Sequence, residues 1–348
     1  MNKDLLREDL KIICSDKRIM KQFNNKTVLI TGATGLIGSL IVKNLILLNE
    51  MCSDNVRIIA ALRNKNKIKD IYDGYNTKEV IFVEGDITTP YREYINEKVD
   101  YIIHTASVTT SKTMIDYPVE TIDSLVLGTK QILELAKNNG SKMIYLSSME
   151  VYGTMAKKGL VNEEEMGYIN PADVRSDYPL GKRMCENMCV AYHREYGVNV
   201  TIARLAQTFG PGVSDSDNRI YVQFAKSVID NKDIVLHTNG ESEGNYCYTR
   251  DALKGIYTIL LEGTSPEAYN ISNEDNHSSI KDMANKVAND IANNSIKVVF
   301  DIPNKKEYGY AATTKMKLDS SKLRKLGWKP EVGLIEQYER LIESMNNE

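Results

Sequence analysis

The chain has 348 residues, of which 42% are hydrophobic and 26% charged, and its formal net charge at pH 7 is -3. This composition suits one or two globular domains, and the dispersed Lys and Arg residues give no electrostatic footprint for nucleic acid, which excludes it as a partner. The five cysteines form no CxxC pair and no apolar run could span a membrane, so we predict no disulfides, no metal, no membrane partner and a cytoplasmic location.

The first predicted element is an N-terminal helical extension over residues 1–25. Between residues 4 and 23 its apolar residues recur near helical spacing. We expect this extension to pack on the rest of the protein or on a second subunit, and the alternative, a lid over a cofactor, has little support.

From residue 26 onward, short apolar runs alternate with amphipathic runs. Buried strands that alternate with helices predict a parallel sheet covered on both faces. We therefore predict an α/β fold with a Rossmann-type doubly wound sheet over residues 26–205. The predicted strands are 27–30, 56–62, 80–83, 101–104, 143–147 and 198–205, and the helices lie near 36–48, 119–138 and 179–196.

Turn residues at Gly210, Pro211 and Gly212 end this alternation. A smaller C-terminal α/β region follows, and we assign residues 206–348 mainly to substrate binding. We expect residues 236–260 to return to the first domain. No low-complexity linker separates the two regions, so they should pack closely.

The turn that connects the first strand to the first helix reads TGATGLIG, from Thr31 to Gly38. Its glycines let backbone amides approach a pyrophosphate, and the helix N-terminus adds favourable partial positive charge. We therefore predict a bound nicotinamide dinucleotide. The candidate cofactor-binding residues are Gly32, Thr34, Gly35, Leu36, Ile37, Arg63, Asp86, Ile87, Ala106 and Lys182.

Two of these residues contribute to the choice and placement of the cofactor. At the end of the second strand, where an acidic residue would bind the ribose hydroxyls of NAD, the chain has Arg63. A basic side chain there suits a 2′-phosphate, which predicts NADP, with NAD as the alternative. Asp86 follows the third strand, where it can accept a hydrogen bond from the adenine amino group.

A phenol and an ammonium group, Tyr178 and Lys182, stand four residues apart and therefore on one helix face. A lysine cation and an oxidised nicotinamide both favour the phenolate, so Tyr178 can exchange a proton with a sugar hydroxyl or carbonyl. Ser148 ends the preceding strand at the carboxyl edge of the sheet and can polarise the reacting oxygen. Ser107 and Ser111 lie in or near a loop that faces the same edge, so we expect both to contact sugar hydroxyls.

Together these residues resemble the extended short-chain dehydrogenase/reductase superfamily, in its NAD(P)-dependent sugar-nucleotide epimerase and dehydratase branch. The resemblance implies that Ser148, Tyr178 and Lys182 are catalytic and that the C-terminal region holds a nucleotide-diphosphate sugar. The motifs that carry it are TGATGLIG, EGDI (84–87), DYIIHTAS (100–107), SSMEVYG (147–153), YPLGK (178–182), ARLAQTFGPG (203–212), AYNIS (268–272) and LGWKP (326–330).

The chain departs from the family pattern at two informative places. Dehydratases usually have Thr-Asp-Glu where this chain has Ser148, Met149 and Glu150, but relatives that decarboxylate or dehydrate through Thr-Ser-Glu keep the glutamate, so Glu150 is a candidate catalytic residue. The family's phosphate-contacting arginine, expected near residues 244–246, is absent. Arg219 and Arg250 are the candidates to replace it as substrate-binding residues.

These observations predict an enzyme, specifically an NADPH-dependent oxidoreductase that reduces a keto group on a nucleotide sugar or CDP-linked ketose. A self-contained epimerase, 4,6-dehydratase or decarboxylase is the close alternative, and a non-catalytic NADP sensor is a distant one. The expected partner is a nucleotide-diphosphate sugar or polyol precursor. The resemblance also implies a homodimer, formed through the helices that contain residues 127–136 and 184–192.

Overall fold

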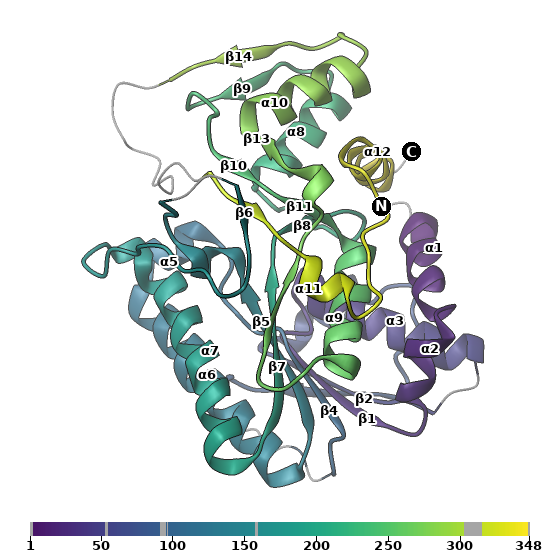
Figure 1. The fold of residues 1–348 in the computed structure, drawn as a ribbon. Coiled ribbons are helices and arrows are strands. Elements are labelled where there is room, and N and C mark those ends of the chain that lie inside the picture. Colours follow the sequence, from purple (N-terminus) through teal and green to yellow (C-terminus); the bar gives the residue numbers. More distant parts are fainter. Residues whose placement is uncertain are drawn as a thin grey trace.

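The computed structural model describes residues 3–52, 55–90, 95, 97–156, 159–302 and 315–346. A seven-stranded sheet forms its centre, in the spatial order β12-β7-β5-β4-β1-β2-β3 (Figure 1). All neighbouring strands are parallel, which confirms the predicted Rossmann-type fold. The strands are β1 (Thr27–Thr31), β2 (Arg57–Leu62), β3 (Val80–Glu84), β4 (Tyr101–His104), β5 (Lys142–Ser148), β7 (Asn199–Leu205) and β12 (Ala268–Ile271).

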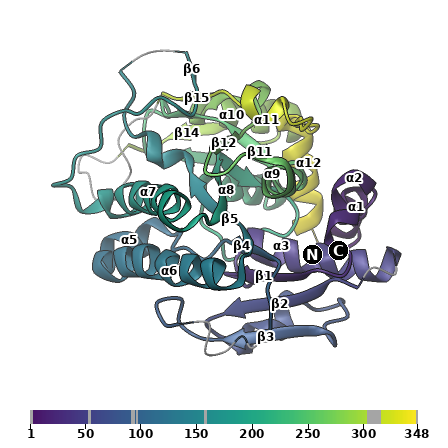
Figure 2. The same cartoon turned by 60° about the horizontal axis from the view of Figure 1, so that its bottom comes forward.

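Helices cover both faces of the sheet because successive strand residues point to opposite sides. Ile30 and Ile103 face a core shared with α3 and α9, whereas Leu29 and Ile102 face a core shared with α6 and α7. Figure 2 shows α6 and α7 side by side in one layer. The bounds of these helices are α3 (Leu36–Cys52), α6 (Pro118–Asn139), α7 (Asp177–Tyr196) and α9 (Thr249–Glu262).

A smaller α/β region lies above the sheet in Figure 1. Its short strands pair two by two: β8 (Gln207–Phe209) with β11 (Tyr246–Tyr248), β9 (Ile234–Leu236) with β14 (Val298–Phe300), β10 (Glu243–Gly244) with β13 (Ser278–Ser279), and β15 (Lys317–Leu318) with β6 (Leu160–Val161). Its helices are α8 (Ile220–Ile229), α10 (Ile280–Lys286), the π-helical η7 (Val287–Ile291), α11 (Ser321–Arg324) and α12 (Leu334–Met345), and a short η6 (Glu274–Asn276) precedes β13.

After β7, the chain contacts the main sheet again through the helix α9 and the strand β12. Within residues 236–260, β10 and β11 belong to small two-stranded sheets, and α9 alone packs on the main sheet. The added strand is β12, where Ala268 lies opposite Ile202 of β7. β12 is four residues long and contains Asn270, and so short a strand carries no signal of which sheet it joins. The assignment of residues 206–348 to substrate binding stays a prediction.

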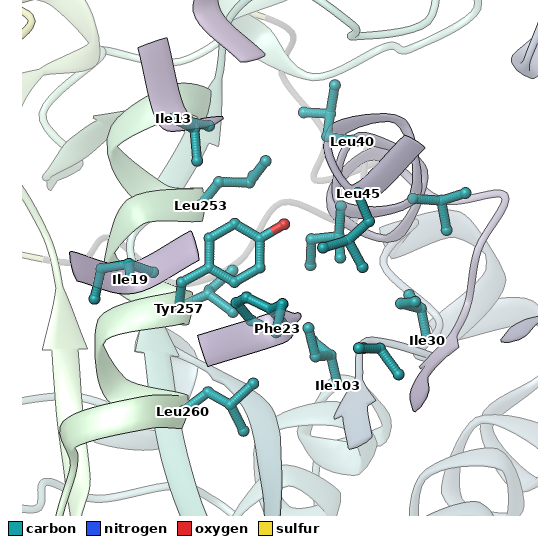
Figure 3. Close-up of a cluster of buried hydrophobic side chains, with 14 of the residues drawn as sticks. Ile13, Ile19, Phe23, Ile30, Leu40, Leu45, Ile103, Leu253, Tyr257 and Leu260 are labelled. Atoms are coloured by element: carbon teal, nitrogen blue, oxygen red, sulfur yellow. The ribbon is translucent and has the colours of Figure 1, made fainter. Parts of the chain in front are cut away.

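The N-terminal extension forms α1 (Lys3–Cys14), α2 (Lys17–Met20) and η1 (Lys21–Phe23). Figure 3 shows Ile13, Ile19 and Phe23 around Tyr257 of α9, in the same apolar cluster as residues of α3. The Tyr257 hydroxyl also donates a hydrogen bond to Asn44 of α3 over 2.9 Å. The extension therefore packs on the body of the protein. Within the described residues, no helix combines the length and apolar character needed to cross a bilayer.

Candidate active site

The glycine-rich turn lies where the order of the strands reverses, between β1 and β4. Gly32 has a φ of +66°, and a Cβ there would lie 2.8 Å from the Cα of Ala106, so a larger residue would push β4 away. Gly35 is exposed, and the nearest atom to an added Cβ would be the Gly32 carbonyl oxygen at 3.4 Å. The outer side of the turn is thus open at the start of α3, which fits a dinucleotide pyrophosphate.

The remaining predicted cofactor residues lie near this turn or at the ends of neighbouring strands. The Ala106 N–H donates to the Thr31 hydroxyl over 3.2 Å and so ties the end of β4 to the turn. Ile87 is buried, and a Cβ on Gly128 of α6 would contact it. The half-buried residues at the turn and the start of α3 are Thr34, Leu36 and Ile37.

The predicted adenosine-binding residues lie close together but carry mixed charge. Arg63 is exposed, immediately after β2 and before η2 (Lys65–Lys67) and α4 (Ile68–Ile71). Hydrogen bonds from the Thr88 N–H and hydroxyl to Oδ1 of Asp86 lower the pKa of that carboxyl, and nearby Arg63 lowers it further. Glu84 accepts a hydrogen bond from the Lys65 N–H over 2.9 Å. A 2′-phosphate at Arg63 would therefore lie near two carboxylates.

Tyr178 and Lys182 lie one turn apart on α7 and are both buried. Lys182 Nζ donates to the Leu146 carbonyl over 2.6 Å and lies 5.7 Å from the centre of the Tyr178 ring. The side chains of Ser148 and Ser107 both lower the pKa of Tyr178, so their hydroxyls lie near the phenol. The structure therefore brings these four predicted residues together at the carboxyl ends of β4 and β5.

Burial controls the ionisation of this cluster. It raises the pKa of Tyr178 well above its usual value, and the charge of Glu150 raises it further, while the hydrogen bonds from Ser148 and Ser107 lower it. Burial also lowers the pKa of Lys182, to about 8. The phenol is consequently protonated at neutral pH, and an additional positive charge, such as that of an oxidised nicotinamide, would favour its ionisation.

Glu150 lies on η4 (Met149–Tyr152), directly after Ser148, and is paired with an arginine that the sequence motifs did not indicate. Arg175 Nη2 lies 3.2 Å and 3.0 Å from the two carboxylate oxygens of Glu150. The Arg175 guanidinium also lies 5.9 Å from the Tyr178 ring centre. Burial raises the pKa of Glu150, although Arg175 opposes this rise. Glu150 and Arg175 thus form part of the Tyr178 cluster.

Two predicted substrate-binding residues border the cluster. Ser111 is exposed at the start of α5 (Ser111–Asp116), a helix that packs on η5 (Val174–Ser176). Arg219 is bonded to Asp217, with 2.9 Å between Nε and Oδ2. Burial lowers the pKa of Arg219, but Asp217 raises it. The nearby Tyr178 phenol also raises this pKa, so the net change is upward. Arg219 is therefore within electrostatic range of Tyr178.

The structure assigns Arg250 to a different place from the predicted substrate site. Its Nη1 donates to Oδ1 of Asp9 on α1 over 2.9 Å. The same oxygen accepts a hydrogen bond from Arg340 of α12 over 2.9 Å, and Oδ2 accepts one from the Tyr248 hydroxyl over 2.5 Å. The guanidinium of Arg250 thus neutralises a buried carboxylate between α1, α9 and α12. Sequence spacing could not reveal this contact, because its partners are far apart in the chain.

The position of the missing family arginine borders the catalytic strand. A Cβ on Gly244 would have the Met149 Cε at 3.8 Å as its nearest contact, so Gly244 lies beside the Ser148–Glu150 run. The adjacent Asn245 is buried and structural, since its side chain donates to the Asn273 carbonyl and accepts from the Leu318 N–H. Because this chain has no arginine at residues 244–246, it lacks the cation that the family pattern places next to the active site.

Sequence reasoning missed Arg175 as a member of the site. The only available signal was its position three residues before Tyr178. A short 3-10 turn over Val174–Ser176, capped by the Asp173 side chain, places it, and the direction of a side chain on such a turn does not follow from spacing alone.

Comparisons with known proteins agree with this architecture. Residues 28–272 match the model of the "NAD dependent epimerase/dehydratase family". UDP-glucuronic acid decarboxylase 6 of Arabidopsis thaliana is 30% identical over 319 residues, which cover 90% of this chain and 87% of that protein. An epimerase from Methanothermobacter thermautotrophicus has a similar structure, with a TM-score of 0.80, 20% identity and 94% of each chain covered. UDP-glucuronic acid 4-epimerase from Bacillus cereus aligns with a TM-score of 0.74 and 20% identity, over 92% of this chain and 98% of that one. The predicted resemblance is therefore confirmed, and the chain is an enzyme that belongs to the NAD-dependent epimerase/dehydratase family.

Proposed function

We propose that this enzyme decarboxylates a nucleotide-linked uronic acid and returns its cofactor to the starting state in each turnover. The observation that carries this proposal is the position of Glu150, which follows Ser148 by two residues and is bonded to Arg175 beside Tyr178. The Ser-Met-Glu run keeps the glutamate of the Thr-Ser-Glu pattern. Relatives named UDP-glucuronic acid decarboxylase support the same choice.

The chain's own residues supply the proton transfers. When bound, NAD supplies reversible acceptance of a hydride. Tyr178 is the group that removes the proton from the sugar hydroxyl, and Lys182 provides the positive charge that favours its phenolate. Ser148 donates a hydrogen bond to the same sugar oxygen. Gly32 and Gly35 leave the backbone accessible to the pyrophosphate, and Lys182 also holds the nicotinamide ribose.

Loss of CO2 requires a carbonyl on the carbon next to the one that bears the carboxylate. The carbonyl oxygen can then hold the electron pair released when the carbon–carbon bond breaks. Tyr178 and Ser148 are placed to hydrogen-bond that oxygen, which stabilises the developing negative charge. Glu150, whose pKa is raised by burial, can hold a proton more readily than an exposed glutamate and is the group proposed to return it to carbon.

The keto reduction predicted from Arg63 is the second candidate function. It would consume NADPH from solution, and a basic residue after β2 favours that cofactor. The names of the relatives favour the self-contained reactions instead, and Glu84 and Asp86 would oppose a 2′-phosphate near Arg63. We therefore propose NAD as the resident cofactor, with NADP as the competing outcome of a direct titration.

The test is to incubate the purified protein with UDP-glucuronic acid without added NADPH. We expect CO2 release with no lasting change in the absorbance of reduced nicotinamide. Consumption of NADPH in proportion to product, without CO2, would establish the reductase in its place. Binding titrations with NAD and NADP accompany the assay, and a lower Kd for NADP would overturn the choice of cofactor.

A homodimer through α6 and α7 is part of the proposal. Several large apolar side chains on these two helices are exposed in the single chain, including Val119 (64%), Met184 (52%) and Val190 (42%). Contact with a second copy would remove them from water. Light scattering after size-exclusion chromatography should give twice the chain mass, and Met184→Lys should shift the protein toward monomer. A monomeric wild type would contradict the dimer.

A further inference from the structure

Arg175 is incompletely bonded despite its burial. Its side chain is 16% exposed, and Nη2 makes the contact with Glu150. Nε and Nη1 are inaccessible to solvent and have no hydrogen-bond partner. A buried N–H group without a partner is unfavourable, and more so when it is charged. Such a group in a catalytic cluster indicates a partner that the protein itself does not supply.

The other cations around the cluster are already bonded. Lys182 donates to the Leu146 carbonyl, Arg219 is paired with Asp217, and Arg183 donates from Nε to the Val151 carbonyl over 2.7 Å. Across the described part of the chain, buried guanidinium nitrogens without partners occur at Arg175 and at Arg250, and Arg250 is committed to Asp9. Among these cations, Arg175 is therefore the one whose buried donor nitrogens lack a partner.

The described residues 244–246, where the family pattern places an arginine, contain no cation. Gly244 lies beside Met149, so this part of the chain brings no positive charge next to Glu150. Asp177, on the other side, has a buried carboxylate oxygen without a partner, so it adds negative charge to the same cluster. A substrate anion that enters here must be matched by Arg175, because Glu150 and Asp177 both repel it.

We propose that Arg175 is the specificity-determining residue that recognises a carboxylate on the sugar of the substrate, and that Glu150 holds its guanidinium when the site is empty. This inference rests on the proposed function. Protein atoms cover Nε and Nη1 of Arg175 in this structure, so a substrate cannot reach them directly. The guanidinium must therefore turn away from Glu150 to bind the substrate. Guanidinium is suited to this exchange because its planar donors can bind a carboxylate through two parallel hydrogen bonds.

The electrostatics of Glu150 are consistent with this exchange. Its pKa is already raised by burial, and Asp177 raises it further. A substrate carboxylate beside Glu150 would add another like charge and favour the protonated form. Protonation weakens the hold of Glu150 on Arg175. Substrate binding therefore frees Arg175 from Glu150. In the same step Glu150 takes up the proton that the proposed reaction requires.

The test compares the Kd of UDP-glucuronic acid with that of UDP-glucose, which differ only in carboxylate against hydroxymethyl. Isothermal titration is used with Arg175 as in the wild type and with Arg175→Gln, both loaded with NAD and both in the Tyr178→Phe background, in which the sugar binds without being converted. We expect the wild type to prefer the carboxylated sugar by about 10- to 100-fold, because a charge-assisted hydrogen bond is of this strength. Arg175→Gln should lose that preference, with the Kd of UDP-glucose changed by less than about threefold.

Control variants separate recognition from folding. Arg194→Gln, at an exposed arginine on α7, should leave both Kd values unchanged. Arg175→Lys keeps the charge without the planar donors and should retain part of the preference, and it replaces Arg175→Gln if that variant does not fold. Glu150→Gln should bind UDP-glucuronic acid more tightly than the wild type, because a neutral side chain releases Arg175. An unchanged or weaker Kd would contradict the exchange.

The outcomes distinguish this inference from the proposed function. A preference retained by Arg175→Gln, or an equal loss of affinity for both sugars, would overturn the role of Arg175 even if CO2 is released. A preference that depends on Arg175 in a protein that releases no CO2 would support the recognition and overturn the decarboxylation. Failure of the wild type to bind either UDP-sugar would contradict both.

Discussion

Two charge clusters, one around Asp9 and one around Glu150, are built from the same kinds of side chain but differ in the burial of the central carboxylate and in the number of side chains that donate to it. The Asp9 carboxylate accepts hydrogen bonds from Tyr248, Arg250 and Arg340, so both of its oxygens are occupied. The Glu150 carboxylate, by contrast, is 36% exposed and accepts from Arg175. Two nitrogens of Arg175 and one oxygen of Asp177 are buried there without partners, against one nitrogen of Arg250 beside Asp9.

This difference separates a structural cluster from a functional one. A carboxylate surrounded by donors from three elements holds those elements together, and it has no capacity for a ligand. A cluster with unmet hydrogen bonds persists because the surrounding fold holds it in place. A ligand that supplies the missing partners lowers its free energy. The contrast predicts that substitutions around Asp9 lower stability, whereas those around Tyr178 lower activity.

The largest effect is expected for Tyr178→Phe. Loss of the phenol removes the proton-transfer group, which should lower kcat by about 10²- to 10⁴-fold. The melting temperature and the Kd for NAD should stay near those of the wild type, because the ring is kept. Turnover is measured as CO2 release from UDP-glucuronic acid. Tyr192→Phe, on the same helix, is the matched control, and unchanged turnover in Tyr178→Phe would remove Tyr178 from the mechanism.

Asp9→Ala should have the opposite pattern. It leaves two guanidinium groups without their buried partner, so the free energy of unfolding should fall by about 3 to 5 kcal/mol. The kcat of the protein that remains folded should be close to that of the wild type. Chemical denaturation gives the first value and steady-state assays the second. Lys11→Ala, at an exposed position on α1, should change neither. A loss of activity without a loss of stability in Asp9→Ala would break the distinction between the clusters.

The smallest of the three effects concerns pH. Burial lowers the pKa of Lys182 to about 8, so the ammonium loses its charge as the pH rises through this value. The pKa of Tyr178 is raised, so the phenol gains no ionisation in the same window. We therefore expect kcat to fall by about tenfold for each pH unit above the Lys182 pKa.

The pH prediction is measured with a kcat profile under saturating substrate. Lys142 is the control, since burial lowers its pKa too, but it lies at the opposite end of β5 from Ser148. The profile of Lys142→Gln should match that of the wild type. A kcat that rises steadily through alkaline pH would show that the charge of Lys182 is not what sustains the reaction.

Features with local causes could be predicted from the amino-acid sequence. The Gly32–Gly38 turn, the Tyr178–Lys182 spacing and the alternation of strands and helices each depend on residues a few positions apart, so their geometry follows from chain stereochemistry. The tertiary structure alone decided the partners of Arg175 and Arg250 and the sheet that β12 joins. The partners of Arg175 and Arg250 lie 25 and 241 positions away in the chain, and β12 has four residues. Neither periodicity nor spacing encodes which distant groups meet when both faces of the sheet are buried.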